Sequence, residues 1–158
     1  MQGELEVVNV RLTKERSLYS DAYIKSSEDA VRIVSEELAN YDREAMCIIN
    51  LNSKSQPICL SIVSVGTLNY CVVSPREIFK ASILANAAAV IAVHNHPSGH
   101  LEPSNEDILM AKRLNKAGNL LGIKLVDFVI CGEKGDFLSF HHTGMMEELS
   151  HAASDWER

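Results

Sequence analysis

The sequence predicts one α/β domain in which helices flank a mixed β-sheet. Short runs rich in β-branched residues alternate with segments of helical periodicity, which is typical of a sheet covered by helices. The 158 residues are 46% hydrophobic and 23% charged, and no linker or repeat divides them. Such values are near the average for a globular domain with a buried core. We expect the domain over residues 26–144, between an N-terminal arm, residues 1–25, and a C-terminal tail, residues 145–158.

The first elements are expected to be an extended segment and a helix. Apolar residues partly alternate in residues 1–25, which predicts an extended arm or an edge strand. Ser26 and Asp29 stand in a capping pattern, and apolar residues recur at helical spacing as far as Tyr41. This combination indicates a helix that begins at Ser26.

Three strands and a second helix are expected next. The runs rich in β-branched residues cover residues 44–51, 57–65 and 67–73. A polar loop separates the first two runs, which favours an antiparallel hairpin. Ser74, Pro75 and Glu77 then give the pattern of a helix start, with Ser74 as the cap and Glu77 three residues after it. This helix is expected to reach Asn86.

The remaining elements surround a glycine- and proline-containing loop. The wholly apolar run 88–93 predicts a buried central strand. Ser104 is expected to cap a helix that continues to about Leu120. Residues 123–131 and 136–140 are expected to form two strands joined by a glycine-containing turn. A final helical segment follows.

Charge and hydropathy limit the classes of partner. The net charge is −6, and the lysines and arginines are scattered along the chain, which argues against nucleic acid as the main ligand. No apolar stretch reaches the roughly 18 residues of a membrane span, and the N-terminus lacks the apolar core of a secretory signal. We therefore expect a cytoplasmic protein without a membrane partner.

The four cysteines are expected to be buried, reduced thiols. They lie in apolar runs and form no C-x-x-C pair, at Cys47, Cys59, Cys71 and Cys131. A zinc site made of cysteines needs closely paired ligands. Any metal site in this chain is therefore expected to use other residue types.

His94, His96 and Asp107 form a candidate metal site. The two histidines are two residues apart at the end of the predicted central strand, so their side chains share one side of the chain. Asp107 lies in the first turn of the helix that Ser104 caps. Two imidazoles and one carboxylate are the three protein ligands of many catalytic zinc sites, which leave a fourth position for water. One zinc ion (Zn2+) per chain is expected, although this ligand set also admits other divalent ions.

Each part of this pattern also has a simpler explanation. Pairs of histidines occur in surface loops, and Ser-x-x-Asp is also an ordinary helix cap. The joint spacing H-x-H-x7-S-x2-D across a strand, a loop and a helix start is more specific than either part. His100 is expected to be exposed and not to be a ligand, because a fourth protein ligand would close the site.

The segment HNHPSGHLEPSNED resembles the JAMM (MPN+, JAB1-type) metalloprotease motif, E…H-x-H-x7-S-x2-D. More narrowly, the chain resembles the RadC-like branch of that family. This resemblance rests on SPREIFKASILANAAAVIAVHNHPSG, PSNEDI and AGNLLGIKLVDFVICG, and it covers roughly residues 38–144. It implies a cytidine-deaminase-like fold of the JAB1/MPN type, with the zinc ligands at the end of the central strand and on the following helix.

The family motif also requires an upstream glutamate, for which the chain offers two candidates. Glu77 lies 17 residues before His94, and Glu44 lies 50 residues before it. The resemblance places the base in the stretch YDREAMCIINLN and therefore points to Glu44. It further implies that Glu44 deprotonates the zinc-bound water and that Ser104 donates a hydrogen bond to the tetrahedral oxyanion. The implied activity is a metallohydrolase that cleaves a peptide or isopeptide-type amide in a protein or peptide substrate.

Two departures from the family pattern and one alternative function remain. The family usually has histidine where this chain has Phe128, and glutamate near the position of His142.

The alternative is a non-catalytic, zinc-containing accessory or scaffold protein associated with DNA repair or DNA metabolism, although Glu44 and Ser104 favour an enzyme. Nucleobase deamination is excluded because the chain has no C-x-x-C. The substrate and the oligomeric state stay open, a homo-oligomer included.

Overall fold

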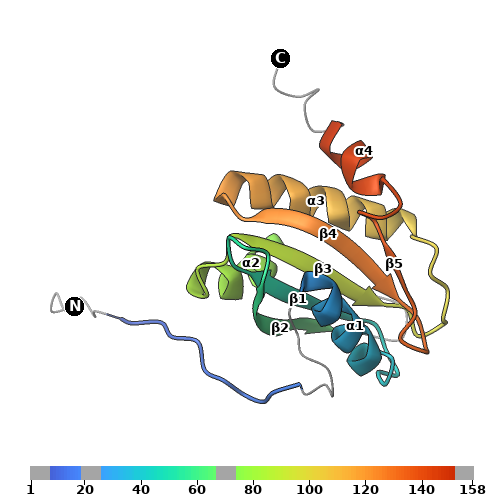
Figure 1. Ribbon diagram of the computed structural model, residues 1–158, viewed down its shortest axis with the longest axis horizontal. Helices are drawn as coiled ribbons and strands as arrows, with labels where there is room; N and C mark the ends of the chain where they lie inside the picture. Colours follow the sequence, from blue (N-terminus) through green and yellow to red (C-terminus); the bar gives the residue numbers. More distant parts are fainter. Residues whose placement is uncertain (1–7, 19–25, 67–73, 152–158) are drawn as a thin grey trace, which may run out of the picture.

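A five-stranded mixed sheet organises the computed structural model, which describes residues 8–18, 26–66 and 74–151 (Figure 1). The spatial order of the strands is β2-β1-β3-β4-β5. The strands are β1 (Ala45–Leu51), β2 (Pro57–Val65), β3 (Ala89–Asn95), β4 (Lys124–Cys131) and β5 (Phe137–Ser139). The helices are α1 (Ser27–Leu38), α2 (Pro75–Leu84), α3 (Asn105–Leu121) and α4 (Met145–His151). The predicted mixed sheet flanked by helices is confirmed, and it is consistent with a JAB/MPN fold.

Strand β3 lies at the centre of the sheet. It is antiparallel to β1, so that Met46 pairs with His94. It is parallel to β4, so that Asn95 pairs with Cys131. The chain passes from β3 to β4 through α3, and the carboxyl ends of both strands therefore lie at the same edge of the sheet.

Helices cover both faces of the sheet. On one face Phe79 of α2, Leu114 of α3 and Phe128 of β4 belong to one buried cluster. On the other face Leu38 of α1 packs with a second cluster that includes Val93. Strand β1 is buried along its whole length because its side chains alternate between these two clusters.

Two of the three expected helix caps are confirmed. Both α1 and α3 begin with a capping box, formed by Ser26 with Asp29 and by Ser104 with Asp107. The capping role expected for Glu77 is wrong. Ser74 precedes α2 without a side-chain capping bond, and a carboxylate oxygen of Glu77 instead accepts a hydrogen bond from Lys80 at 2.7 Å.

Several expectations fall at the limits of the described residues. The expected strand 67–73, which contains Cys71, lies outside them, whereas residues 8–18 are described without a helix or strand. The division into an arm, a domain and a tail stays a prediction. Cys47 and Cys131 are buried as expected, and Cys59 is half-buried. No helix within the described ranges is long and apolar enough to cross a membrane.

Gly118 should be required for the contact between α3 and β4. A Cβ atom at this position would overlap the carbonyl oxygen of Ile123 and lie 3.2 Å from the ring of Phe79. We expect Gly118→Ala to lower the free energy of unfolding by about 2 kcal/mol, as overpacked sites do, despite the higher helix propensity of alanine. Urea denaturation measures this change.

The control is Leu120→Ala, because Leu120 lies on the same helix and is 88% exposed. Its free energy of unfolding should change by no more than about 0.5 kcal/mol. Equal stability of Gly118→Ala and the wild type would contradict this close packing.

Candidate metal centre

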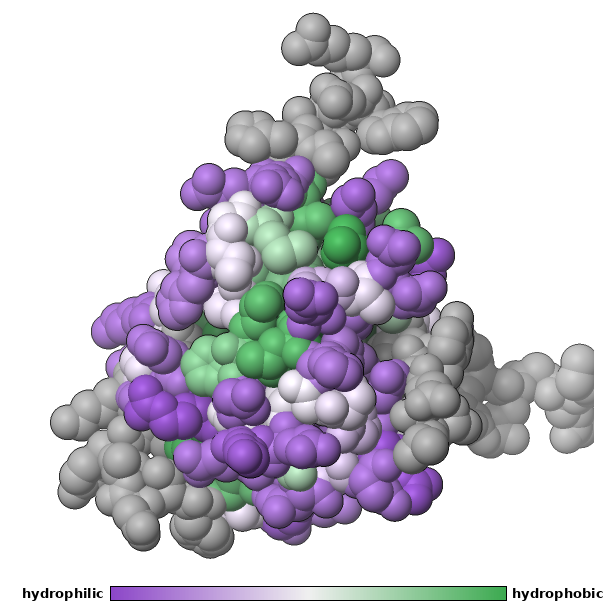
Figure 2. Space-filling model, turned by 90° about the vertical axis from the view of Figure 1, so that its right-hand side faces the viewer, coloured by the Kyte–Doolittle hydropathy of each residue, from purple (hydrophilic) through white to green (hydrophobic). Residues whose placement is uncertain are grey.

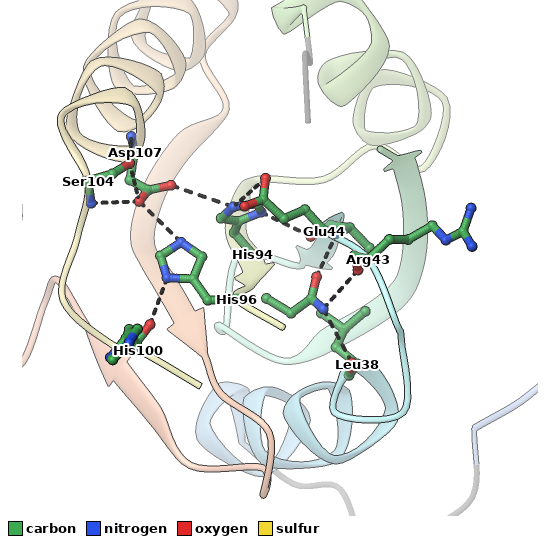
Figure 3. A network of polar contacts seen from close by, with 10 residues as sticks. Leu38, Arg43, Glu44, His94, His96, His100, Ser104 and Asp107 are labelled. Carbon is green, nitrogen blue, oxygen red and sulfur yellow. Dashed lines mark hydrogen bonds and ion pairs between the residues drawn. The ribbon is translucent and has the colours of Figure 1, made fainter. Parts of the chain in front are cut away.

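The candidate site lies where β3 ends and α3 begins (Figure 3). His94 is the penultimate residue of β3, and His96 follows the strand directly. Because β3 is extended, residues two apart project to the same side. A loop of residues 97–103 then returns the chain, so that Asp107 in the first turn of α3 faces both rings.

The capping box of α3 fixes the carboxylate of Asp107. One carboxylate oxygen, Oδ2, accepts hydrogen bonds from the backbone N–H of Ser104 at 2.8 Å and from its hydroxyl at 2.7 Å. The Ser104 hydroxyl in turn accepts the backbone N–H of Asp107 at 3.1 Å. The local signal that starts the helix therefore also aims the carboxylate at the histidines.

The spacing of the three side chains fits one metal ion. Nε2 of His96 lies 3.3 Å from Oδ2 of Asp107, and Nε2 of His94 lies 3.6 Å from Oδ1. One donor atom from each residue lies within 4.8 Å of the other two. Ligands at 2.0–2.2 Å from a tetrahedral ion are separated by about 3.3–3.6 Å. The predicted residues thus come together in a cluster able to hold a metal ion.

Two backbone carbonyls orient the imidazole rings. Nδ1 of His94 lies 3.1 Å from the carbonyl oxygen of Ala45, and Nδ1 of His96 lies 2.7 Å from that of His100. A carbonyl oxygen only accepts hydrogen bonds, so Nδ1 carries the proton in both rings. In the neutral rings the Nε2 lone pairs are therefore free for a metal, which is the usual arrangement of metal-binding histidines.

The electrostatics of the cluster favour the ligating forms of two residues. Burial lowers the pKa of His94, which keeps this imidazole neutral. Burial alone would raise the pKa of Asp107, but hydrogen bonds from His96 and Ser104 outweigh it and lower that pKa to about 2. The hydrogen bond with Asp107 raises the pKa of His96. Metal binding must therefore displace a proton from the protonated form of His96.

Glu44 lies beside the ring of His94, whereas Glu77 lies on α2, away from the cluster. A carboxylate oxygen of Glu44 is 3.8 Å from Nε2 of His94, and Figure 3 shows this side chain pointing to the rings. Burial raises the pKa of Glu44. Glu77 is in the first turn of α2, where its carboxylate pairs with Lys80.

Sequence reasoning missed two contributions to the site. The side chain of His100 is exposed as expected, but its carbonyl oxygen holds the ring of His96. Asn95, between the two histidines, is buried and forms hydrogen bonds to the chain on both sides of Glu44. The only sequence signal was the polar amide of Asn95 at the end of an apolar strand.

The residues that depart from the family pattern lie outside the cluster. Phe128 is buried, and its ring centre lies 5.0 Å from that of Phe140 in the core. The backbone N–H of His142 donates to Ser139, whose hydroxyl donates to Asp127 at 2.6 Å. Phe128 therefore belongs to the core, and the backbone of His142 is bonded in the turn after β5.

The surface beside the cluster offers room for a ligand. A cleft of about 460 Å³ is lined by residues at the end of α1 and by the segments that follow β3 and β4, including Tyr41, His96, Pro97 and Glu133. Figure 2 shows the face toward which β3 and β4 run. Its margin is mostly hydrophilic, and hydrophobic residues lie near its centre.

The low pKa of Asp107 predicts a measurable effect of acid on the metal-free protein. A fall from the ordinary value of 3.8 to about 2 corresponds to about 2 kcal/mol of stability. A lowered pKa gives stability that is fully present above about pH 4 and is lost as the pH falls through about 2. Asp107→Asn should therefore lose less free energy of unfolding between pH 5 and pH 2 than the wild type. Urea unfolding with a chelator present tests this, and parallel curves for the two proteins would contradict it.

Comparisons with known proteins show which proteins this chain is similar to. A model of the RadC-like JAB domain family matches residues 24–145. A UPF0758 protein of Desulforamulus reducens is 44% identical over 123 residues, which are 78% of this chain and 54% of that protein. A UPF0758 protein of Clostridium kluyveri is 44% identical over 138 residues, 85% of this chain and 60% of that protein. The chain thus spans less than two thirds of the length of these relatives. It belongs to the RadC-like JAB domain family.

Proposed function

We propose that this protein is a zinc-dependent hydrolase that cleaves a peptide or isopeptide-type amide in a protein or peptide substrate. The family supports a metallohydrolase of the JAMM type. The observation that carries the proposal is the convergence of the His94, His96 and Asp107 side chains, with Glu44 at 3.8 Å from one ring. A metal ion with a purely structural role would not need a further carboxylate such as Glu44 beside its ligands.

The three clustered residues would hold the ion, and Glu44 would act as the general base. Bound zinc would polarise the scissile carbonyl and lower the pKa of the attacking water. Glu44 takes a proton from that water and donates it to the nitrogen of the leaving amine. Its raised pKa brings it closer to neutral pH, where one group can both accept and release a proton.

Ser104 is proposed to assist at the carbonyl oxygen of the substrate. Its hydroxyl donates to Asp107 in the structure, so this role requires the hydroxyl to turn toward the substrate. A donor at that oxygen stabilises the negative charge that develops in the transition state. The cytoplasmic location and a protein or peptide as substrate, rather than nucleic acid, belong to the same proposal.

Removing one histidine should abolish zinc binding. We expect His96→Ala to bind little or no zinc after removal of metal and reloading, because only two ligands remain. Elemental analysis of the purified protein gives the zinc content. His100→Ala is the matched control, since the backbone carbonyl of His100 that contacts His96 is kept in this variant, and it should bind zinc as the wild type does. Equal zinc in His96→Ala and the wild type would exclude this site.

Removing the base should abolish turnover but not zinc binding. Peptides and isopeptide-linked peptides serve as the substrate panel, with cleavage followed by mass spectrometry. On any substrate that is cleaved, Glu44→Gln should lower kcat by about 100-fold to 10,000-fold, as loss of a general base does. Its zinc content should be unchanged.

Glu77→Gln is the control for this substitution, because Glu77 pairs with Lys80 on the exposed surface of α2. It should turn over substrate at the wild-type rate. A Glu44→Gln variant that keeps both its zinc and its full activity would show that another group acts as the base.

A further inference from the structure

Asn95 is a buried polar residue that the proposed chemistry does not use. It lies between the two histidines of the cluster, and only 2% of its surface is exposed. Successive side chains of a strand project to opposite faces, so the amide of Asn95 points away from the metal ligands. A buried amide requires hydrogen-bond partners, and Asn95 finds them in the segment before β1.

The side chain of Asn95 binds the chain on both sides of Glu44. Its amide oxygen accepts the backbone N–H of Ala45 at 2.5 Å. Its amide nitrogen donates to the carbonyl oxygens of Arg43 at 3.1 Å and of Leu38 at 3.5 Å. Figure 3 labels Arg43 and Leu38, whose carbonyl oxygens accept two of these bonds.

Other contacts complete the support of this short segment. The ring of His94 contacts the carbonyl oxygen of Ala45, and the backbone N–H of Gly66 donates to the carbonyl oxygen of Glu44 at 2.7 Å. Strand β1 begins only at Ala45. The sheet therefore does not extend over Arg43, and the Asn95 amide takes the place of a strand partner there.

We propose that Asn95 is a positioning residue that fixes Glu44 relative to the two histidines. This inference rests on the proposed role of Glu44 as the base. The segment His94-Asn95-His96 supplies two metal ligands on one side and holds the backbone of the base on the other. The distance between the ion and the base then depends on one short stretch of β3. A displacement of about 1 Å can lower a rate by about 100-fold.

The test compares four variants loaded with Co2+, whose visible absorption responds to groups near the ion. They are Asn95→Ala, Glu44→Gln, the double variant and Asn50→Ala as control. Asn50 is also a buried asparagine, on β1, with side-chain contacts to Cys59 and Ser61. The measurements are Co2+ affinity, hydrogen exchange at the Ala45 amide, the cobalt spectrum and turnover on any substrate found.

We expect Asn95→Ala to bind Co2+ within about tenfold of the wild type, because it loses no ligand. The Ala45 amide should lose its protection from exchange. The cobalt spectrum should change in the same direction as in Glu44→Gln, and turnover should fall by about 100-fold. The double variant should match Glu44→Gln, since a residue that acts through Glu44 adds nothing once Glu44 is gone.

Two results would overturn the inference. One is an Asn95→Ala protein with the spectrum and turnover of Asn50→Ala, when Glu44→Gln changes both. The other is a double variant whose loss is the full product of the two single losses, because Asn95 would then act independently of Glu44.

Failure of this inference and failure of the proposed function give different results in these measurements. If Glu44→Gln turns over substrate normally, the role as base fails. A cobalt spectrum and an Ala45 exchange rate altered as described would still support positioning of Glu44 by Asn95. If Asn95→Ala does not fold, the nearly isosteric Asn95→Asp takes its place. It keeps the acceptor for Ala45 but loses both donors, so a partial spectral change supports the inference and a wild-type spectrum overturns it.

Discussion

The end of β3 is hydrogen-bonded to a strand on each side, to β1 through antiparallel pairing and to β4 through parallel pairing. Apolar side chains bury this strand on both faces, so its backbone has little freedom to move. His94 and Asn95 are the last residues of the strand, and each of their side chains bonds to the beginning of β1. The positions of the rings and of the backbone at Glu44 follow from this arrangement. The strand supplies the rigidity that a preorganised site requires.

The start of α3 connects local stability to the chemistry of the site. The same carboxylate of Asp107 closes the capping box with Ser104 and faces both histidines. The N-terminus of a helix stabilises the ionised form of a capping carboxylate. The ionised form is also the one that binds a metal. Helix initiation and the proposed role of Asp107 as a metal ligand therefore require the same ionised side chain. This double use explains why a capping pattern and a metal motif occupy the same four residues, Ser104 to Asp107.

The mixed sheet and the candidate ligands His94, His96 and Asp107 could be predicted from the sequence, because strand periodicity, capping and the H-x-H spacing are local signals. Glu44 could be predicted only from the family resemblance, since 50 residues separate it from His94. The pairing of β1 with β3 brings the two residues together in the fold. The carbonyl of His100 could not be predicted, because every residue carries a carbonyl. The bonds of Asn95 depend on three chain segments that meet only in the folded state. For Glu77 the local pattern predicted a helix cap that does not form. Its carboxylate instead accepts a hydrogen bond from Lys80.

In the proposed metal centre, two imidazoles and one carboxylate hold a single ion at the end of β3. X-ray absorption at the zinc edge of the reloaded protein identifies the atoms bound to the ion. We predict scattering from two imidazoles, with zinc–nitrogen distances of about 2.0–2.1 Å, and from oxygen ligands, without sulfur. A sulfur shell at about 2.3 Å, or a spectrum without imidazole scattering, would contradict it.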